Sequence, residues 1–234
     1  MEIVNLKRGT EMKTAQIILT IWITILLQGC VTSSNYLTIE QLQEKALLDD
    51  AQAQYKLARY YEHKKNFQES LMWYEKSASK EYASAQNELG NIYKESRLGI
   101  KKDLDKAFKW YKKASDNGYF DAINNLGYMY DLGLGTKQDY LKAAELYELA
   151  ASQGSIRAMY NLGIMYKQGQ GVEKDMIQAY KWFDLARYYT LTSKNITLKW
   201  SIRKQWDELE TTMSNHDKKI AKSLATKWQK ELME

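Results

Sequence analysis

The stretch AMYNLGIMYKQGQGVEKDMIQAYKWFDLA, residues 158–186, decides the fold of this chain. Its first part places Leu162 and Tyr166 four residues apart, so both side chains lie on one face of a helix. Gly163 beside the leucine lets a partner helix approach closely, which compensates for the low helix propensity of glycine. After a glycine-rich loop, Asp175 can cap a second helix that carries an aromatic pair. The stretch therefore predicts a helix–loop–helix unit.

The same spelling occurs four times along the chain. The core leucine of the first helix recurs after 32, 37 and 36 residues, and a bulky residue of the second helix recurs after 37, 36 and 36. The two rows are Leu57, Leu89, Leu126 and Leu162, and Trp73, Trp110, Leu146 and Trp182. A period of about 20–50 residues indicates a solenoid, in which stacked helical units share one core. We therefore predict an all-α fold, a right-handed α-solenoid of four helix pairs over residues 39–187.

Polar residues and glycines occur at matching positions in the repeat units. Three aspartates precede the second helices and suit N-capping, and two glycines lie just past the ends of these helices, where a left-handed residue terminates them. These residues are Asp103, Asp139 and Asp175, and Gly118 and Gly154. The Gly-x-Gly loops that begin at Gly133 and Gly169 also invite a nucleotide-binding interpretation. No strand precedes them and no Lys-Ser/Thr follows, so we interpret them as structural turns.

These residues resemble the Sel-one-like repeat, a relative of the tetratricopeptide repeat. The loop Gly169-Gln-Gly171-Val172-Glu-Lys-Asp175 matches the Gly-x-Gly-Val-x-x-Asp spelling of that family. The loop from Gly133 to Asp139 matches with Thr136 in place of Val, and the loop that ends at Asp103 has lost its first glycine, with Arg97 in its place. The resemblance covers residues 46–187 and implies a tetratricopeptide-like solenoid that binds other proteins.

The repeat spelling stops after Tyr188. Trp206, Leu209 and Met213 continue a helical apolar pattern, and the segment from Ser214 to Asp217 is typical of a capping box at the start of another helix. We expect residues 188–234 to form helices that cover the apolar face of the last repeat. This arrangement is similar to the carboxy-terminal helices of many bacterial Sel-one-like proteins.

The amino terminus differs from the repeats in composition. Basic residues precede an apolar run from Ala15 to Leu27. As a helix this run spans about 20 Å, short of the roughly 30 Å core of a bilayer, which indicates a signal peptide. The run ends in Leu27-Gln28-Gly29-Cys30, which resembles the bacterial lipobox, although Gln28 replaces the usual small residue. We predict a lipoprotein signal peptide over residues 1–29, and a lipidated Cys30 on a flexible tether over residues 30–38.

An ordinary signal peptide and an uncleaved anchor are the alternatives for this segment, and translation could begin at Met12. Val31 follows the cysteine where an aspartate would mark inner-membrane retention. The resemblance therefore implies a lipid anchor in the bacterial cell envelope, with the outer membrane favoured and the protein facing the periplasm. Cys30 is the only cysteine of the sequence, so the mature chain cannot form an intramolecular disulfide.

The sequence offers no constellation of residues for chemistry. Thirty-four basic and 29 acidic residues are interleaved, which favours a solvated mixed surface over a nucleic-acid site. His63 and His216 are far apart and have no metal-ligand spacing. No nucleophile and base can be paired, and the cysteine pairs of relatives described as penicillin-binding or β-lactamase-like are missing. We therefore expect no enzyme activity, no cofactor, no metal and no small-molecule substrate.

The resemblance also implies a concave groove lined by the first helices, with contacts two residues before, two after and five after the core leucine. On this sequence the partner-binding candidates are Tyr55, Arg59, Asn87, Asn91, Asn124, Tyr128, Tyr160 and Lys167, with Glu62, Lys94, Asp131 and Ile164 at equivalent positions. Tyrosine and arginine are frequent interface anchors, and asparagine can bond a peptide backbone. The alternative is a merely solvated face.

The leading functional prediction is a lipid-anchored adaptor that binds another protein or peptide of the envelope in this groove. The alternative is an immunity protein that neutralises a type VI secretion phospholipase effector, because similar Sel-one-like lipoproteins are encoded beside such effectors.

Overall fold

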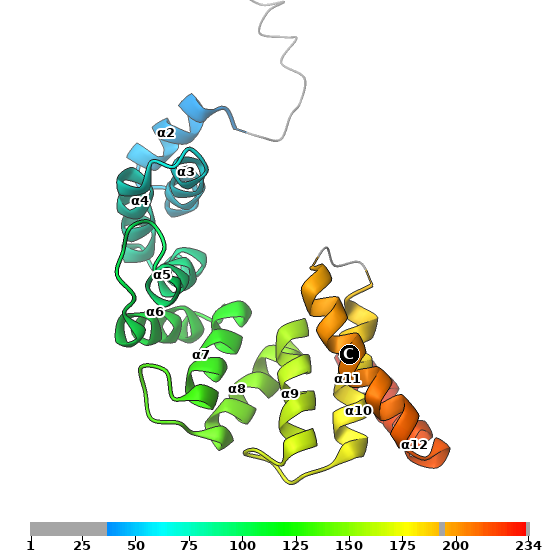
Figure 1. Cartoon of the computed structure of the whole chain (residues 1–234). Helices are drawn as coiled ribbons and strands as arrows, with labels where there is room; N and C mark the ends of the chain where they lie inside the picture. The colour runs from blue at the N-terminus through cyan, green and yellow to red at the C-terminus, as the bar shows by residue number, and fades with distance from the viewer. Residues whose placement is uncertain (1–36, 192–194, 233–234) are drawn as a thin grey trace, which may run out of the picture. The chain divides into compact units, whose positions relative to one another are not determined.

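The structure, a computed structural model, describes residues 37–191 and 195–232 (Figure 1). The predicted signal peptide and Cys30 lie outside the described residues. The chain divides into two units, Met1–Leu42 and Gln43–Glu234. Helix α2 (Ile39–Leu47) begins in the first unit, and the other helices of the described residues belong to the second. In the part that is described, none of the helices has the length and apolar character needed to span a membrane.

The described residues form eleven α-helices and no strand, which confirms the predicted all-α solenoid. Four helix pairs follow α2, and two longer helices close the chain. The pairs are α3 (Ala51–His63) with α4 (Phe67–Ser79), α5 (Ala83–Glu95) with α6 (Leu104–Asp116), α7 (Phe120–Leu132) with α8 (Tyr140–Ser152), and α9 (Ile156–Gln168) with α10 (Met176–Tyr189). The last helices are α11 (Ile196–Thr212) and α12 (Asn215–Glu231). From α4 to α10, each helix packs against the one before it and the one after it.

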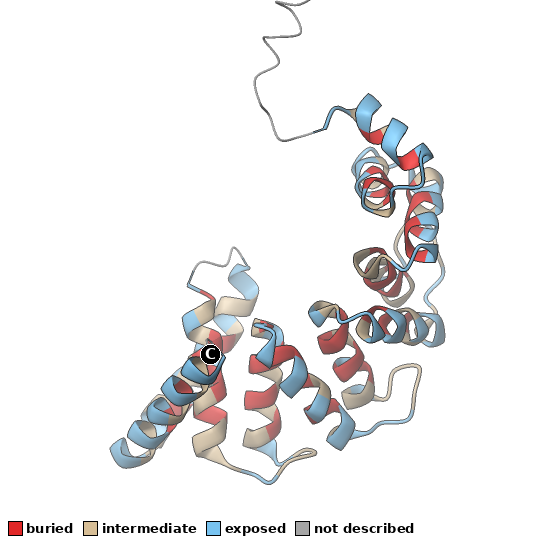
Figure 2. Cartoon of the chain, turned by 180° about the vertical axis from the view of Figure 1, so that it is seen from behind, coloured by how far each residue is buried: buried red, intermediate tan, exposed pale blue. Residues whose placement is uncertain are grey.

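The second unit has two sides, which we name after the helices that they carry. The inner side carries the first helices α3, α5, α7 and α9, and the outer side carries α4, α6 and α8 (Figure 1). Buried residues concentrate where neighbouring helices face one another, and exposed residues cover the faces turned away (Figure 2).

The core leucines are buried as predicted, and so are Trp73 and Trp182 of the predicted second row, but the row of fully buried rings lies one residue further along. The predicted leucines are at most 5% exposed, whereas Trp110 and Leu146 of the predicted second row are only partly buried. The fully buried row consists of their neighbours Tyr74, Tyr111, Tyr147 and Phe183. The small residue after each leucine explains the shift, because the ring of the second helix fills its place. A Cβ atom on Gly163 would lie 2.5 Å from Cε1 of Phe183, so the glycine is required for this close approach.

The predicted caps are present. Asp103, Asp139 and Asp175 each accept a hydrogen bond from a backbone N–H of the first turn that follows. The predicted terminators Gly118 and Gly154 have positive φ angles of 74° and 89°, immediately after the C-caps of α6 and α8.

The loop between α5 and α6 departs from the prediction. The left-handed cap that Gly133 and Gly169 supply after α7 and α9 is supplied here by Ser96, with φ of 58°, and not by the residue at Arg97. This loop is one residue longer than its counterparts, since 14 residues separate Leu89 from its following aspartate and 13 separate Leu126 from its own. The extra residue frees the arginine from the capping position.

The two last helices cover the end of the stack. Both α11 and α12 pack on α10, and the indole rings of Trp182 and Trp228 meet edge to face with centroids 5.2 Å apart. Ser214 caps α12 as expected from the capping box, since its hydroxyl accepts from the Asp217 N–H and donates to the carboxylate of the same residue. The described part of residues 188–234 therefore has the arrangement expected of a cap.

Candidate partner-binding site

The inner side of the first two repeats contains an open pocket of about 510 Å³. Its walls come from α3, from α5, from the buried ring of α4 and from the longer loop after α5. The lining residues are Tyr55, Arg59, Glu62, His63, Tyr74, Glu88 and Arg97. Two of these, Tyr55 and Arg59, are predicted partner-binding residues.

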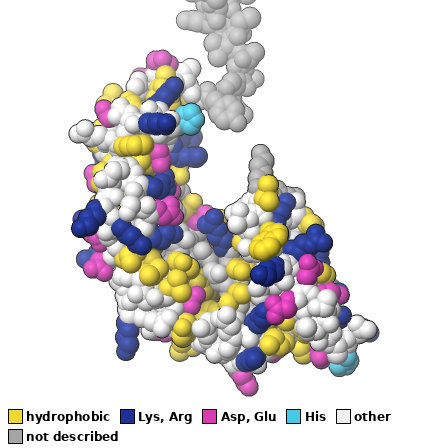
Figure 3. Space-filling model, viewed as in Figure 1, with side chains coloured by type: hydrophobic (Ala, Val, Ile, Leu, Met, Phe, Trp, Pro, Cys, Tyr) yellow, Lys and Arg dark blue, Asp and Glu magenta, His cyan; other side chains and the backbone are white. Residues whose placement is uncertain are grey.

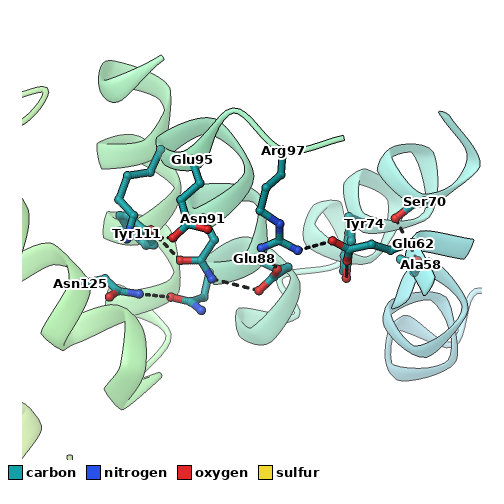
Figure 4. A network of polar contacts seen from close by, with 12 residues as sticks. Ala58, Glu62, Ser70, Tyr74, Glu88, Asn91, Glu95, Arg97, Tyr111 and Asn125 are labelled. Atoms are coloured by element: carbon teal, nitrogen blue, oxygen red, sulfur yellow. Dashed lines mark hydrogen bonds and ion pairs between the residues drawn. The ribbon is translucent and has the colours of Figure 1, made fainter. Parts of the chain in front are cut away.

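A polar network built around Arg97 forms the floor of this pocket (Figure 4). The guanidinium donates to the carboxylate of Glu62 on α3 and to that of Glu88 on α5, so it links the first two repeats. Tyr74 donates from its hydroxyl to Glu62 at 2.9 Å, and Asn91 donates to Glu88 at 3.0 Å. Burial opposes the charge of Arg97, but the hydrogen bond that it donates to Glu62 and the charge of Glu88 outweigh this effect and raise the pKa of the guanidinium. The network therefore presents a fixed, fully charged surface at the bottom of the pocket.

Tyr55 and Arg59 stand at the rim of the pocket and keep surface that a partner can contact. The Tyr55 ring is half-buried and packs against the rings of Tyr74 and Tyr82, with centroids 5.8 and 5.5 Å apart. Arg59 is exposed, and its guanidinium carbon lies 6.0 Å from the centre of the Tyr55 ring. A tyrosine held by two other rings and an arginine free to reorient are suited to anchor a partner.

Asn87 and Asn124 occupy different surroundings, because they are 7% and 5% exposed. Each accepts a hydrogen bond from an asparagine of the following repeat, Asn87 from Asn125 at 2.9 Å and Asn124 from Asn161 at 3.3 Å. These pairs join α5 to α7 and α7 to α9 along the inner side. The two asparagines therefore hold neighbouring repeats in register and offer little side-chain area to a partner.

The predicted residues of the middle of the groove form a second, more open group. Asn91 accepts a hydrogen bond from the Tyr111 hydroxyl at 2.7 Å. The ammonium of Lys94 lies 5.7 Å from the centre of the Tyr111 ring. The same ammonium lies 5.9 Å from the ring of Tyr128, which is 39% exposed. Burial raises the pKa of the Tyr111 hydroxyl well above its usual range. Tyr128 can therefore contact a partner on the inner side, beside the ammonium of Lys94.

The last two candidates lie where the carboxy-terminal helices meet the fourth repeat. Lys167 donates to Gln205 at 2.9 Å and to Glu208 at 2.7 Å, so α11 engages this cation. Tyr160 is half-buried and packs on the ring of Phe183, with centroids 5.8 Å apart. The structure therefore leaves Tyr55, Arg59 and Tyr128 accessible, buries Asn87 and Asn124 between repeats, and engages Lys167 with α11.

Sequence reasoning missed Glu88 and Arg97 as parts of this site. Arg97 was assigned to a degenerate turn, and Glu88 lies one residue before its core leucine, outside the contact positions expected from the tetratricopeptide pattern. The available signal was the length of the loop after α5, since an inserted residue in a repeat often changes what the loop presents.

Two serine hydroxyls of α4 form links between helices, and His63 and His216 are both exposed. Ser70 and Ser77 donate from their hydroxyls to the backbone carbonyls of Ala58 and Ala51, where they join α4 to α3. Among residues 37–191 and 195–232, no group of three or more His, Cys, Asp and Glu side chains could hold a metal ion.

The chain is a helical-repeat protein, because its helix pairs stack in order and asparagine pairs join neighbouring repeats on the side that carries the polar pocket. The Sel1 repeat family model matches residues 51–82, 83–119, 120–155 and 156–187. Because these matches cover more than half of the sequence, the chain belongs to the Sel1 repeat family. Sel1 repeat proteins are generally non-enzymatic scaffolds that bind other proteins. No curated protein matches the chain.

Solved structures of the same fold resemble the chain. A Sel1 repeat protein from Oxalobacter formigenes is 25% identical, with a TM-score of 0.65 over 83% of this chain and 77% of that one. A protective antigen with an SLR fold from uropathogenic Escherichia coli strains is 28% identical, with a TM-score of 0.62 over 74% of this chain. The match spans 41% of the length of that antigen.

Proposed function

We propose that this protein is a lipid-anchored adaptor of the bacterial cell envelope that binds a protein or peptide partner on its inner side. The observation that carries the proposal is the pocket over the first two repeats, because its charged floor is fixed by Arg97 while Tyr55 and Arg59 remain at its rim. A binding surface that is already ordered loses less conformational entropy when a partner docks. Family membership supports the same conclusion, since protein binding is the general role of Sel1 repeats.

We propose that the role is non-enzymatic. The pocket carboxylates Glu62 and Glu88 are both engaged by one guanidinium, and His63 is exposed at the edge of the pocket. A general base needs an oxygen or nitrogen free to reach the proton of a substrate, whereas these carboxylate oxygens already accept hydrogen bonds from Arg97. Buried serines of the same repeat donate to backbone carbonyls, so they serve as links between helices.

The envelope location and the anchor rest on the lipobox-like sequence that ends at Cys30. Acyl chains on this cysteine would hold the protein stably, since each buried methylene contributes about 0.8 kcal/mol. Growth with an alkyne-bearing fatty acid is expected to label the protein, and Cys30→Ser is expected to abolish the label. A Cys30→Ser protein that keeps the label would contradict the anchor.

Affinity capture from the native envelope tests the binding surface. The combined change Tyr55→Ala and Arg59→Ala removes the rim of the pocket and leaves Arg97, Glu62 and Glu88 in place. We expect this double variant to lose capture of a specific partner protein. The control variant Lys109→Ala with Leu141→Ala on the outer side is expected to capture that partner as the parent does. Equal capture by the inner-side and outer-side variants would reject the proposed surface.

The immunity function predicted as an alternative would use the same surface with a different partner. Expression of the chain beside a type VI phospholipase effector tests it directly. If the parent protein restores growth and the Tyr55→Ala, Arg59→Ala protein does not, the result would favour immunity over an adaptor role.

A further inference from the structure

The amino-terminal part of α11 exposes large apolar side chains on a face that no described element covers. Ile196 is 80% exposed and Trp200 is 66% exposed. The two residues are four apart, so their side chains lie on the same helix face. Figure 3 shows yellow and dark-blue side chains side by side over this part of α11. The opposite face of the same helix carries the buried Ile202 and Leu209.

The charge around Ile196 and Trp200 is mainly positive. Lys199, Arg203 and Lys204 lie within the same two helical turns, and the sequence contains no acidic residue between Asp184 and Asp207. The ammonium of Lys204 lies 5.5 Å from the ring of Trp200. Among the described residues, the exposed Arg203 pairs with Asp207 at 3.5 Å, and Lys199 donates to the Leu191 carbonyl at 3.1 Å. In a chain whose charges otherwise alternate, this segment is an isolated basic and aromatic surface.

A basic pocket adjoins the same face, between the end of α10 and α11. It has a volume of about 370 Å³ and combines three cations with one carboxylate. Its lining residues are Arg187, Thr190, Leu191, Lys199, Arg203, Trp206 and Asp207. The guanidinium of Arg187 pairs with Asp184 at 3.0 Å, and its buried Nε atom has no hydrogen-bond partner among the described residues. The cations that line the pocket suit a phosphate group.

We propose that this face of α11 docks on the surface of an anionic lipid bilayer, with Ile196 and Trp200 entering the interface and the cations facing lipid phosphates. Tryptophan beside lysine and arginine is the side-chain combination that favours the boundary between headgroups and acyl chains. The apolar area of the two side chains is on the order of 300 Å², well below the roughly 800 Å² that each partner contributes to a stable protein interface. A bilayer therefore fits this face better than a second copy of the chain.

This contact does not depend on a lipid at Cys30, and it adds to the proposed function. A solenoid held only by a flexible tether can turn freely, whereas a second contact through α11 would fix which way the inner side faces.

A single fluorescent label tests the contact in the full chain. Cys30→Ser makes the sequence free of cysteine, so Ile196→Cys provides one site for an environment-sensitive dye. Vesicles of phosphatidylcholine mixed with phosphatidylglycerol are expected to shift the emission of this label to the blue, and vesicles of phosphatidylcholine alone much less. The matched control is Leu141→Cys on α8, where the native side chain is 63% exposed. The apolar run from Ala15 to Leu27 is the same in both proteins, so binding through it cannot produce a difference.

Charge removal tests the role of the cations. Lys199→Gln with Lys204→Gln is expected to lower vesicle affinity by about fivefold for each lysine, while Lys109→Gln with Lys137→Gln leaves it unchanged. An unmoved label at position 196, or an equal shift at position 141, would overturn the proposal. A shift that grows with protein concentration without vesicles would assign the face to a second copy instead. A shift produced by inorganic phosphate alone would assign the pocket to a soluble anion.

Discussion

Replacement of Arg97 by methionine tests whether the pocket floor joins the first two repeats. The change keeps much of the side-chain length but leaves Glu62 and Glu88 without their cation, in positions where their side chains are 24% and 18% exposed. A hydrogen bond to a charged group contributes about 1.5–3 kcal/mol to stability. Because Glu62 and Glu88 are partly exposed, the bond from Arg97 to each of them is expected to contribute an amount near or below the low end of this range. We therefore expect Arg97→Met to lower the free energy of unfolding by about 2 kcal/mol.

Urea unfolding followed by circular dichroism measures this loss, and a matched control is available on the outer side. Lys112 pairs with Asp116 within α6, where both side chains are more than half exposed. Lys112→Met is expected to change stability by less than about 0.5 kcal/mol. A double-mutant cycle of Arg97→Met with Glu88→Gln should give a coupling energy of about 1 kcal/mol. If Arg97→Met were as neutral as the Lys112 variant, or if the cycle gave no coupling, the network would not hold the repeats together.

Three further changes test other parts of the structure. Gly163→Ala places a methyl group against the buried Phe183 ring and should destabilise the fold by about 1–2 kcal/mol despite a better helix propensity, with Phe183→Leu relieving most of the loss in chemical denaturation. Burial raises the pKa of Asp131, so its charge opposes folding at neutral pH and this penalty disappears as the pH falls below the unfolded value. Asp131→Asn should therefore be more stable than the parent at neutral pH and equal to it in acid, which unfolding curves at the two pH values can check. Trp228→Ala removes the edge-to-face contact with the last repeat and should lower the melting temperature by several degrees, about 2 kcal/mol, in a thermal scan.

Each of these changes has an outcome that contradicts its reasoning. A Gly163→Ala protein as stable as the parent would mean that the two helices can separate without loss. An Asp131→Asn difference that grows in acid would reverse the sign of the burial effect. A Trp228→Ala protein with unchanged stability would show that α12 does not cap the core.

The architecture was predictable because short-range chemistry repeats with it. An aspartate that caps the second helix and a leucine in the first helix recur at nearly constant spacing, so both the helices and their stacking follow from local pattern. The identity of the second core row was not predictable with the same rule, since Trp110 and Tyr111 are adjacent and both apolar. Their order is decided across the interface by Gly90, which leaves room for the tyrosine ring alone.

The site was predictable in position but not in detail. Tyr55 and Arg59 lie on the inner side, where the family pattern places contacts, whereas Asn87 and Asn124 turn out to be buried links between repeats. A signal for these links exists in the sequence, because the second, third and fourth repeats each carry an asparagine one or two positions before the core leucine. Arg97 could not be placed in the same way, since its role depends on a one-residue insertion whose path only the folded loop reveals.

Site-specific photo-crosslinking in living cells tests the proposed binding surface most directly. A photoreactive amino acid at Arg59 probes the inner side, and the same group at Lys109 probes the outer side. We expect a discrete crosslinked partner from position 59 and none from position 109. Crosslinks of equal strength from both positions, or from the outer position alone, would contradict a partner held on the inner side.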